Sequence, residues 1–511
     1  MSAARAGRRS AGVAEVAIPP AFGARMADEL GAREAATLLA ALQRAPLTGL
    51  RVRAEDGPVA ALLERCGWAG TTLPWSPEGA LLAAPEPASG RHPAPGRHPA
   101  SLHPWQDAGA YYLQDPSAMG VVPILDPRPG DRVLDLAAAP GGKSTYIADR
   151  LRGEGLLWSH DVDSRRVDAL IGNLERWGVG NAVVSQGPVD VLGPLRGYFD
   201  KVLLDAPCSG EGLFRKSADA RRLWSAARVA EFASLQARLL DFAVELLRPG
   251  GVLVYATCTF ETAENEGQMA ALLARRPDLR PEALDVPGAE HGLSVAGGQP
   301  GLELACARWW PQRQTGEGHF AARLRRDTET ASPATDEPAR GRAPGTAARQ
   351  RQGRKAKDRG YGEPVPSAEL AAYQAFVDEA LGGAAPGASS HEGASLRSHR
   401  GQLWLVPERA ELHGLAPRRV GAPLGTSLRG RFEPHHAFAR LLPSHGDHAR
   451  HLDLTCGDPD LHAYLRGETI AAAVPDGWLL VRAEGLPLGW AKAKRGELNN
   501  HYPRGLRHRW G

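Results

Sequence analysis

Short apolar runs alternate with segments of helical periodicity between residues 130 and 260. The runs are RVLDLAA (132–138), GLLWSHD (155–161), NAVVSQ (181–186), DKVLLDAP (200–207) and GGVLVYATCT (250–259). This alternation is typical of a parallel sheet with crossover helices, because both faces of such a sheet are buried. The pattern therefore predicts an α/β domain in which ligands gather at the carboxyl ends of the strands.

The regions on either side of this pattern differ from it. Residues 18–68 carry apolar positions at helical spacing, in PPAFGARMADELGAREAATLLAALQRAP (19–46) and in GPVAALLERCGW (57–68), so we expect a helical N-terminal domain. Residues 82–104 form a Pro/Gly/His-rich loop. Residues 326–360 lose apolar periodicity and become densely basic, which predicts a flexible linker.

Composition narrows the class of protein. The net charge of +3 does not by itself indicate a nucleic-acid partner, whereas 43% hydrophobic residues in 511 suffice for several cores. Five widely spaced cysteines form no disulfide framework and indicate a reducing cytoplasm. No apolar run approaches the roughly 18 residues that a membrane span needs. We expect a cytoplasmic monomer without membrane contact.

The first apolar run leads into a loop of small residues, VLDLAAAPGGKSTYIA (133–148). Three alanines leave room for a ligand against the backbone, and two glycines expose N–H groups at a helix N-terminus. Asp161 ends the next strand, where a carboxylate can accept hydrogen bonds from two ribose hydroxyls. Turn, helix, strand and acid in this order indicate an adenosine-type ligand. The GxxxxGK[ST] spacing of a phosphate P-loop is absent.

Two cysteines follow apolar strands, Cys208 in VLLDAPCSGEG (202–212) and Cys258 in VLVYATCTF (252–260). Both thiols should project to the edge that carries the nucleotide loop. A buried cysteine is usually inert packing, but two at equivalent strand ends beside such a loop indicate nucleophilic chemistry. A CxxC motif and a partnering histidine are both absent, so we expect no metal site. The residues alone do not show which of the two thiols is the nucleophile.

Three motifs resemble those of the Sun-type RNA cytosine-C5 methyltransferases: DLAAAPGGKST (135–145), DAPCSGEGLFRK (205–216) and YATCTFETAENE (255–266). ARWWPQRQTGEGHFAARL (307–324) is similar to the end of that catalytic domain, and PLGWAKAKRGELNNHYPRGLR (487–507) resembles the PUA-like tail of the RsmF subgroup. The resemblance implies a class I, Rossmann-like methyltransferase domain. The expected divisions are an N-terminal RNA-recognition region (1–120), the methyltransferase domain (121–325), the linker (326–360), a small mixed domain (361–430) and a PUA-like RNA-binding domain (431–511).

The resemblance also implies an activity. A methyl group would pass from S-adenosylmethionine to C5 of a cytosine in RNA, through a covalent bond between a cysteine and C6. Addition of a thiolate at C6 gives the poorly nucleophilic C5 the carbanion character that it needs. The subgroup implies small-subunit (16S) rRNA as substrate. The same reaction on tRNA, and a non-catalytic role as a ribosome-assembly RNA-binding protein, stay open.

The catalytic roles come from the family, residue by residue. Cys258 is the nucleophile and Cys208 assists release of the product. Lys143 is an active-site base or cation. Asp205 is expected to hold the N3/N4 edge of the cytosine, with a raised pKa that keeps a proton available for N3.

Binding residues follow from the same motifs. Gly187 and Pro188 stand where the family has an acid for the adenine amine, and Asp190 is the expected substitute. The predicted cofactor residues are Ala137, Ala138, Ala139, Pro140, Gly141, Gly142, Lys143, Asp161, Asp190 and Asp205. The predicted RNA contacts are Arg215, Lys216, Lys492, Lys494, Arg504 and Arg507. Trp490, Tyr502 and Trp510, in the same basic segment, are expected to stack on unpaired bases.

Overall fold

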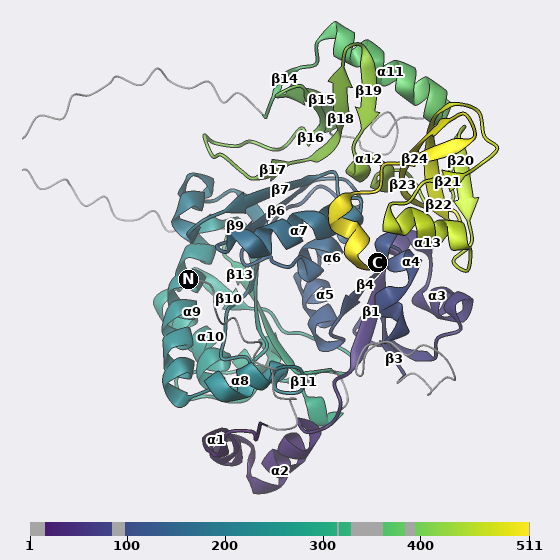
Figure 1. Ribbon diagram of the computed structural model, residues 1–511. Helices are drawn as coiled ribbons and strands as arrows, with labels where there is room; N and C mark the ends of the chain where they lie inside the picture. Colours follow the sequence, from purple (N-terminus) through teal and green to yellow (C-terminus); the bar gives the residue numbers. More distant parts are fainter. Residues whose placement is uncertain (1–15, 84–97, 314–315, 329–360, 384–393, 510–511) are drawn as a thin grey trace, which may run out of the picture.

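A mixed β-sheet built from residues 132–326 lies at the centre of the structure (Figure 1). The computed structural model describes residues 16–83, 98–313, 316–328, 361–383 and 394–509. Five parallel strands occupy the middle of the sheet in the order β9-β8-β5-β6-β7. Their bounds are β5 (Arg132–Asp135), β6 (Leu156–Asp161), β7 (Ala182–Gln186), β8 (Phe199–Asp205) and β9 (Leu247–Thr257). Each matches one of the apolar runs, so the predicted α/β fold is confirmed.

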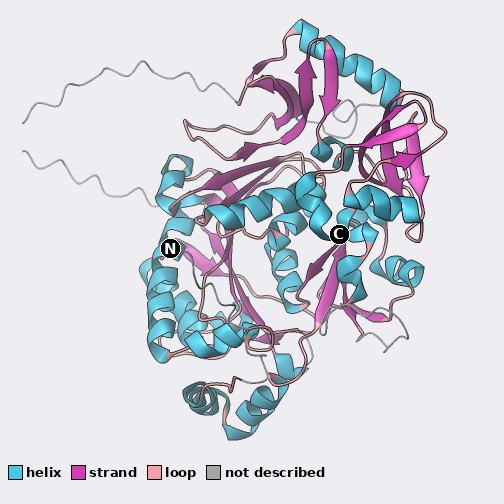
Figure 2. Ribbon diagram, in the orientation of Figure 1, coloured by secondary structure: helices cyan, strands magenta, loops and turns pink. Residues whose placement is uncertain are grey.

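Helices cover both faces of this sheet (Figures 1 and 2). One face carries α9 (Ala226–Leu246) and α10 (Glu266–Arg275), and the other carries α5 (Val121–Leu125), α6 (Gly142–Leu151) and α7 (Ser164–Arg176). Successive strand residues alternate between the two cores; in β6, Leu156 and Trp158 face one and Leu157 the other. Burial on both faces explains why the strands are continuous apolar runs.

The strand order reverses between β5 and β8. From β5 the chain proceeds to β6 and β7 on one side, and then returns to β8 and β9 on the other. In an open α/β sheet, ligands bind at the carboxyl ends of the strands beside such a reversal. The loop after β5 and the ends of β8 and β9 therefore meet at one place.

Antiparallel strands extend the sheet at both edges. Next to β9 lie β13 (His319–Arg326), β12 (Cys306–Trp309) and β11 (Glu290–His291), and β10 (Leu279–Pro281) also pairs with β13. At the other edge, β17 (Arg419–Val420) pairs with β7, although it comes from the C-terminal part of the chain. The buried Arg419 guanidinium donates to the Val179 and Gly421 carbonyls, at 3.0 and 2.7 Å. These contacts attach the C-terminal part to the central sheet.

The N-terminal part contains the expected helices α1 (Pro20–Leu30), α2 (Ala32–Ala41) and α3 (Val59–Cys66). It also contains a four-stranded antiparallel sheet, so the expectation of a helical domain was incomplete. The strands, in the order β2-β3-β1-β4, are β1 (Thr48–Val52), β2 (Gly70–Leu73), β3 (Ser76–Leu82) and β4 (Tyr111–Gln114). The sequence pattern did not reveal this sheet because strands this short carry little periodicity. In addition, β4 pairs with β1 across about sixty residues of chain.

The C-terminal part is built on two five-stranded sheets. The first contains β14 (Glu363–Pro364), β15 (Ala394–His399), β16 (Gln402–Pro407), β18 (Ala422–Leu428) and β19 (Arg431–Pro434), with α11 (Ser367–Leu381) and α12 (His436–Arg440) beside it. The second contains β20 (His451–Leu454), β21 (Ile470–Ala471), β22 (Gly477–Ala483), β23 (Leu486–Lys494) and β24 (Glu497–Asn500), with α13 (Pro459–Arg466). Because β19 forms a hairpin with β18, the division expected between 430 and 431 falls inside a sheet. Residues 329–360 of the expected linker lie outside the described residues.

The N-terminal sheet and the second C-terminal sheet share one core. Leu50 of β1 and Tyr111 of β4 belong to the same buried cluster as Leu461 and Leu465 of α13. Figure 1 shows α13 beside α4 (Pro104–Asp107) and β4. No helix in the described ranges is both long and apolar enough to cross a membrane.

We expect the substitution Leu465→Ala to lower the free energy of unfolding by about 2–5 kcal/mol, because it empties a fully buried position. Exposed Leu428→Ala, the control, should change it by less than about 0.5 kcal/mol. Hydrogen exchange checks the shared core: amides of β1 and β4 should exchange faster in Leu465→Ala. Faster exchange confined to residues 451–509 would contradict a common core.

Candidate active site

The loop after β5 lines a cavity of about 250 Å³. At the start of α6, Gly141 has a φ of 111°, which L side chains rarely adopt, and a Cβ there would lie 3.0 Å from a Leu170 methyl. The cavity is lined by Tyr112, Leu113, Gln114, Ala118, Asp135, Ala137, Ala138, Ala139, Pro140, Gly142, Lys143 and Asp205. Most residues predicted for the cofactor therefore surround one space.

Two acids that we expected at this cavity do not line it. The Asp161 side chain accepts hydrogen bonds from the Ala139 and Asp163 backbone N–H groups, at 3.1 and 3.0 Å, and is only 2% exposed. Its carboxylate holds the loop in place, and the expected ribose contact stays a prediction. Asp190 is exposed in the 3₁₀ helix Val189–Leu195 and lies outside the cavity lining.

Asp135, at the end of β5, is a site residue that the sequence interpretation missed. Its Oδ2 accepts a hydrogen bond from the Ser144 hydroxyl at 2.7 Å, whereas its buried Oδ1 has no hydrogen-bond partner among the described residues. Burial raises the pKa of Asp135 to about 7. A buried carboxylate oxygen without a partner, at the wall of a cavity, fits a ligand that carries an ammonium group.

Asp205 ends β8 and forms an ion pair with Lys143, whose Nζ lies 2.6 Å from Oδ2. His319 of β13 places its Nε2 3.6 Å from Oδ1. Burial alone would raise the pKa of Asp205, but the Lys143 charge and the nearby His319 outweigh it, so the pKa lies well below its usual range. The expectation of a raised pKa was therefore wrong, because these neighbours favour the ionised form of Asp205.

The two thiols that follow β8 and β9 are neighbours. Cys208 Sγ lies 3.4 Å from Cys258 Sγ. The hydrogen bond to Cys258 and burial raise the pKa of Cys208 well above its ordinary value. Cys208 therefore keeps its proton and can donate it toward the sulfur of Cys258. The predicted meeting of both thiols at one edge of the sheet agrees with this geometry.

A buried polar cluster behind the thiols fixes their two loops. Ser209 and Thr259 follow the two cysteines, and their hydroxyl oxygens lie 3.1 Å apart. Glu264 accepts hydrogen bonds from the Ser209 backbone N–H at 3.1 Å and from Gln236 at 2.7 Å, and Glu211 accepts one from the Ser209 hydroxyl at 2.6 Å. Both carboxylates lie within the quoted motifs, but the motifs alone do not distinguish supporting residues from reacting ones.

Arg215, predicted to bind phosphate, is buried. Its guanidinium donates to the Ala41 carbonyl at 3.0 Å and lies 3.7 Å from the Glu317 carboxylate. These partners hold Arg215 within the protein, so a direct phosphate contact is not supported. Lys216 is about one-third exposed and lies 3.5 Å from Asp115, where it can still reach a ligand.

The basic C-terminal segment is placed only partly as predicted. Its four cations include the exposed Lys494 and Arg504 and the half-buried Lys492 and Arg507. Trp490 and Tyr502, two aromatic residues of this segment, are each 1% exposed; Trp510 lies outside the described residues. The expectation that Trp490 and Tyr502 stack on unpaired bases was therefore wrong, because both rings are part of the core.

Three family models match this chain. The model for 16S rRNA methyltransferase RsmB/F matches residues 122–325, the first C-terminal domain of RsmF rRNA methyltransferase matches 376–442, and the methyltransferase RsmF PUA domain matches 452–508. The ribosomal RNA small subunit methyltransferase F of Erwinia tasmaniensis is 31% identical over 96% of this chain and 97% of its own length. The chain belongs to the ribosomal RNA small subunit methyltransferase F family. The Klebsiella pneumoniae relative of the same name is 32% identical over 92% of each chain.

Solved structures show where the RsmF-family fold is shared. A methyltransferase homologue from Pyrococcus horikoshii has a TM-score of 0.50 and 32% identity, covering 60% of this chain and 95% of that one. The structure of NSun6 from the same organism with SFG has a TM-score of 0.51 and 23% identity, covering 61% and 99%. Together with the family models, these likenesses confirm the Rossmann-like methyltransferase fold and the PUA domain.

The buried Glu264 predicts a pH dependence of stability. Burial raises its pKa to about 7, above the value of about 4.3 in an unfolded chain. The folded protein then binds more protons between these values, so this group's contribution to stability is complete below about pH 4 and is lost as pH rises through 7. We expect Glu264→Gln to show a smaller fall in the urea midpoint between pH 5 and pH 8 than the unsubstituted protein. Exposed Glu408→Gln should behave like the unsubstituted protein; an identical slope in Glu264→Gln would contradict the raised pKa.

Proposed function

We propose that this RsmF-family protein transfers a methyl group from S-adenosylmethionine to C5 of a cytosine in RNA, with Cys258 as the covalent nucleophile. The observation that carries the proposal is the 3.4 Å approach of Cys208 and Cys258 beside the Lys143–Asp205 ion pair. Two thiols and a charged pair at the end of neighbouring strands are the groups that a covalent addition to a pyrimidine requires.

The cofactor cavity supports this proposal. The unpartnered Asp135 oxygen fits the ammonium group of S-adenosylmethionine, and the small side chains of Ala137–Ala139 leave space beside the backbone. When bound, this cofactor supplies an electrophilic methyl group. Lys143 and Asp205 line the same cavity, which brings the cofactor site next to the groups that would hold the cytosine.

Cys258 attacks after its S–H proton has passed to the solvent. Its sulfur forms a bond to C6, the electron pair of the C5=C6 bond moves to C5, and C5 takes the methyl group. A water molecule from the solvent then takes the C5 proton, the C5–H electron pair restores the double bond, and the C6–S bond breaks with its electron pair returning to the sulfur. The Cys208 S–H, 3.4 Å from the departing sulfur, stabilises the thiolate as it leaves.

The Lys143–Asp205 pair activates the cytosine ring. The Asp205 carboxylate can accept a hydrogen bond from the N4 amine, since the Lys143 charge and the nearby His319 lower its pKa and favour the ionised form. We propose that the N3 proton passes from the Lys143 ammonium through Asp205 Oδ2, which is 2.6 Å away. The proton returns by the same path when the adduct collapses. Asp205 thus relays a proton that Lys143 stores.

Family membership favours 16S rRNA as the substrate. The relatives carry the name ribosomal RNA small subunit methyltransferase F, and the PUA domain adds exposed cations such as Lys494 and Arg504. The same reaction on tRNA would use the same site. A purely RNA-binding role leaves the paired thiols and the charged pair without a purpose, so it is the weaker hypothesis.

Substitution of each thiol should separate their roles. We expect Cys258→Ala to form no covalent complex with RNA and Cys208→Ala to accumulate one, because the first removes the nucleophile and the second removes the donor that helps it to leave. The measurement is a denaturing gel after incubation with 16S rRNA and S-adenosylmethionine, with Cys66→Ala, remote from the site, as control. The reverse pattern would assign the attack to Cys208.

The ring-activating role predicts a large effect of Asp205→Asn. The amide keeps the shape but cannot relay a proton, so we expect methyl transfer to fall by about 10²–10⁴-fold. Affinity for S-adenosylmethionine, measured by calorimetry, should change much less. Asp190→Asn, outside the cavity, is the matched control. Nearly full activity of Asp205→Asn would exclude the proposed relay.

A further inference from the structure

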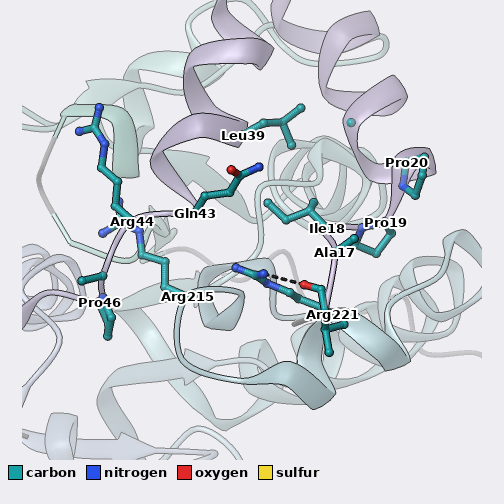
Figure 3. Close-up of a pocket in the computed structure, with 13 residues that line it drawn as sticks. Ala17, Ile18, Pro19, Pro20, Leu39, Gln43, Arg44, Pro46, Arg215 and Arg221 are labelled. Atoms are coloured by element: carbon teal, nitrogen blue, oxygen red, sulfur yellow. Dashed lines mark hydrogen bonds between the residues drawn. The ribbon is translucent and has the colours of Figure 1, made fainter. Parts of the chain in front are cut away.

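A second, larger cavity lies where α1 and α2 approach the segment after β8 (Figure 3). Its volume is about 720 Å³, within the range of about 300–1,000 Å³ that is usual for sites of small organic ligands. Ile18, Leu39 and Pro46 form an apolar wall. The exposed side chain of Gln43 offers an amide at the same space.

Three arginines line this cavity, and one of them, Arg215, lies 3.7 Å from the Glu317 carboxylate. Arg221 donates to the Val16 carbonyl at 2.7 Å, the bond drawn in Figure 3, and Arg215 donates to the Ala41 carbonyl at 3.0 Å. Backbone acceptors thus fix the orientation of these two buried guanidinium groups at the wall. Arg44, in contrast, is exposed and lines the same cavity. Arginine planes and apolar side chains are the surfaces on which unpaired RNA bases stack.

The cavity is linked to the candidate active site. A neighbouring cavity of about 530 Å³ shares Pro46 and Arg215 with it. This neighbouring cavity also shares Leu113 and Gln114 with the cavity of the cofactor loop. Lys216 lines the neighbouring cavity as well. The three spaces therefore follow one another from the Lys143–Asp205 pair to the arginine-lined cavity, a course that an extended single strand could take.

We propose that the arginine-lined cavity binds one unpaired nucleotide of the substrate RNA that flanks the target cytosine. The base lies between the apolar wall and the fixed guanidinium groups, Gln43 hydrogen-bonds to its edge, and Arg44 contacts its phosphate. This inference rests on the proposed function, since it takes RNA as the substrate. Residues 1–15, which precede the cavity in the chain, carry three arginines and one glutamate, so their charge makes them a poorer occupant than RNA.

The charge of Arg44 provides the first test. We expect Arg44→Glu in the full-length protein to weaken binding of a 16S rRNA transcript by at least about 10-fold, and Arg44→Ala to reduce the slope of log Kd against log salt by about 1. Affinity for S-adenosylmethionine should stay within about twofold. Arg33→Glu is the matched control, because Arg33 is an exposed arginine of α2 that does not line the cavity.

Filling the space tests the cavity without changing its charge. Ala45 lines the cavity and Ala36 does not, and both are exposed. We expect Ala45→Trp to weaken binding of the transcript by about as much as Arg44→Glu does, and Ala36→Trp to leave it unchanged. Equal affinities in the Ala45→Trp and Ala36→Trp variants would overturn the proposal. So would a lower melting temperature of Ala45→Trp with unchanged RNA affinity, which would indicate that residues 1–15 fill the cavity.

The test of the cavity and the test of the proposed function can fail independently of each other. If the unsubstituted protein binds the transcript without methylating it, the proposed reaction fails, while the comparison of affinities still decides whether the cavity binds RNA. If methyl transfer occurs and the cavity variants bind as their controls do, the reaction stands and the flanking-nucleotide site is wrong.

Discussion

The parallel pairing of β8 with β9 is the constraint on which the site depends. The register that sets Asp205 opposite Ala256 ends both strands at the same level, so the loops that carry Cys208 and Cys258 start side by side. The hydroxyl groups of Ser209 and Thr259 then join the loops directly. Without that register the two thiols, fifty residues apart in the chain, would not meet at 3.4 Å.

Buried charge supports this geometry at a cost in free energy. Glu211 and Glu264 are carboxyl groups with raised pKa values behind the thiols. Both oxygens of Glu264 and one oxygen of Glu211 accept hydrogen bonds, whereas Oε2 of Glu211 has no partner among the described residues. Asp205 represents the opposite case, because Lys143 keeps it ionised despite burial. The Cys208 thiol, whose pKa is raised, lies beside the sulfur of Cys258.

The sequence predicted the central sheet well because its strands are buried on both faces, which leaves uninterrupted apolar runs such as that of β6. It did not predict β17, whose partner in β7 lies more than two hundred residues away. The meeting of Cys208 and Cys258 could be predicted because motifs mark the ends of their strands. The state of Asp205 could not, since the decisive neighbours, Lys143 and His319, come from a different helix and strand. Trp490 likewise looked like an exposed ring among lysines, but the residues of β23 around it are buried on both faces.

The central claim is that the protein methylates C5 of a cytosine in RNA with Cys258 as the nucleophile that adds to C6. It is tested most directly by bisulfite sequencing of 16S rRNA. Cells that lack the gene should be compared with the same cells supplied with the unsubstituted protein or with Cys258→Ala. The account predicts at least one cytosine that resists conversion only when the unsubstituted protein is present. Full conversion in all three samples, or restored resistance with Cys258→Ala, would contradict it.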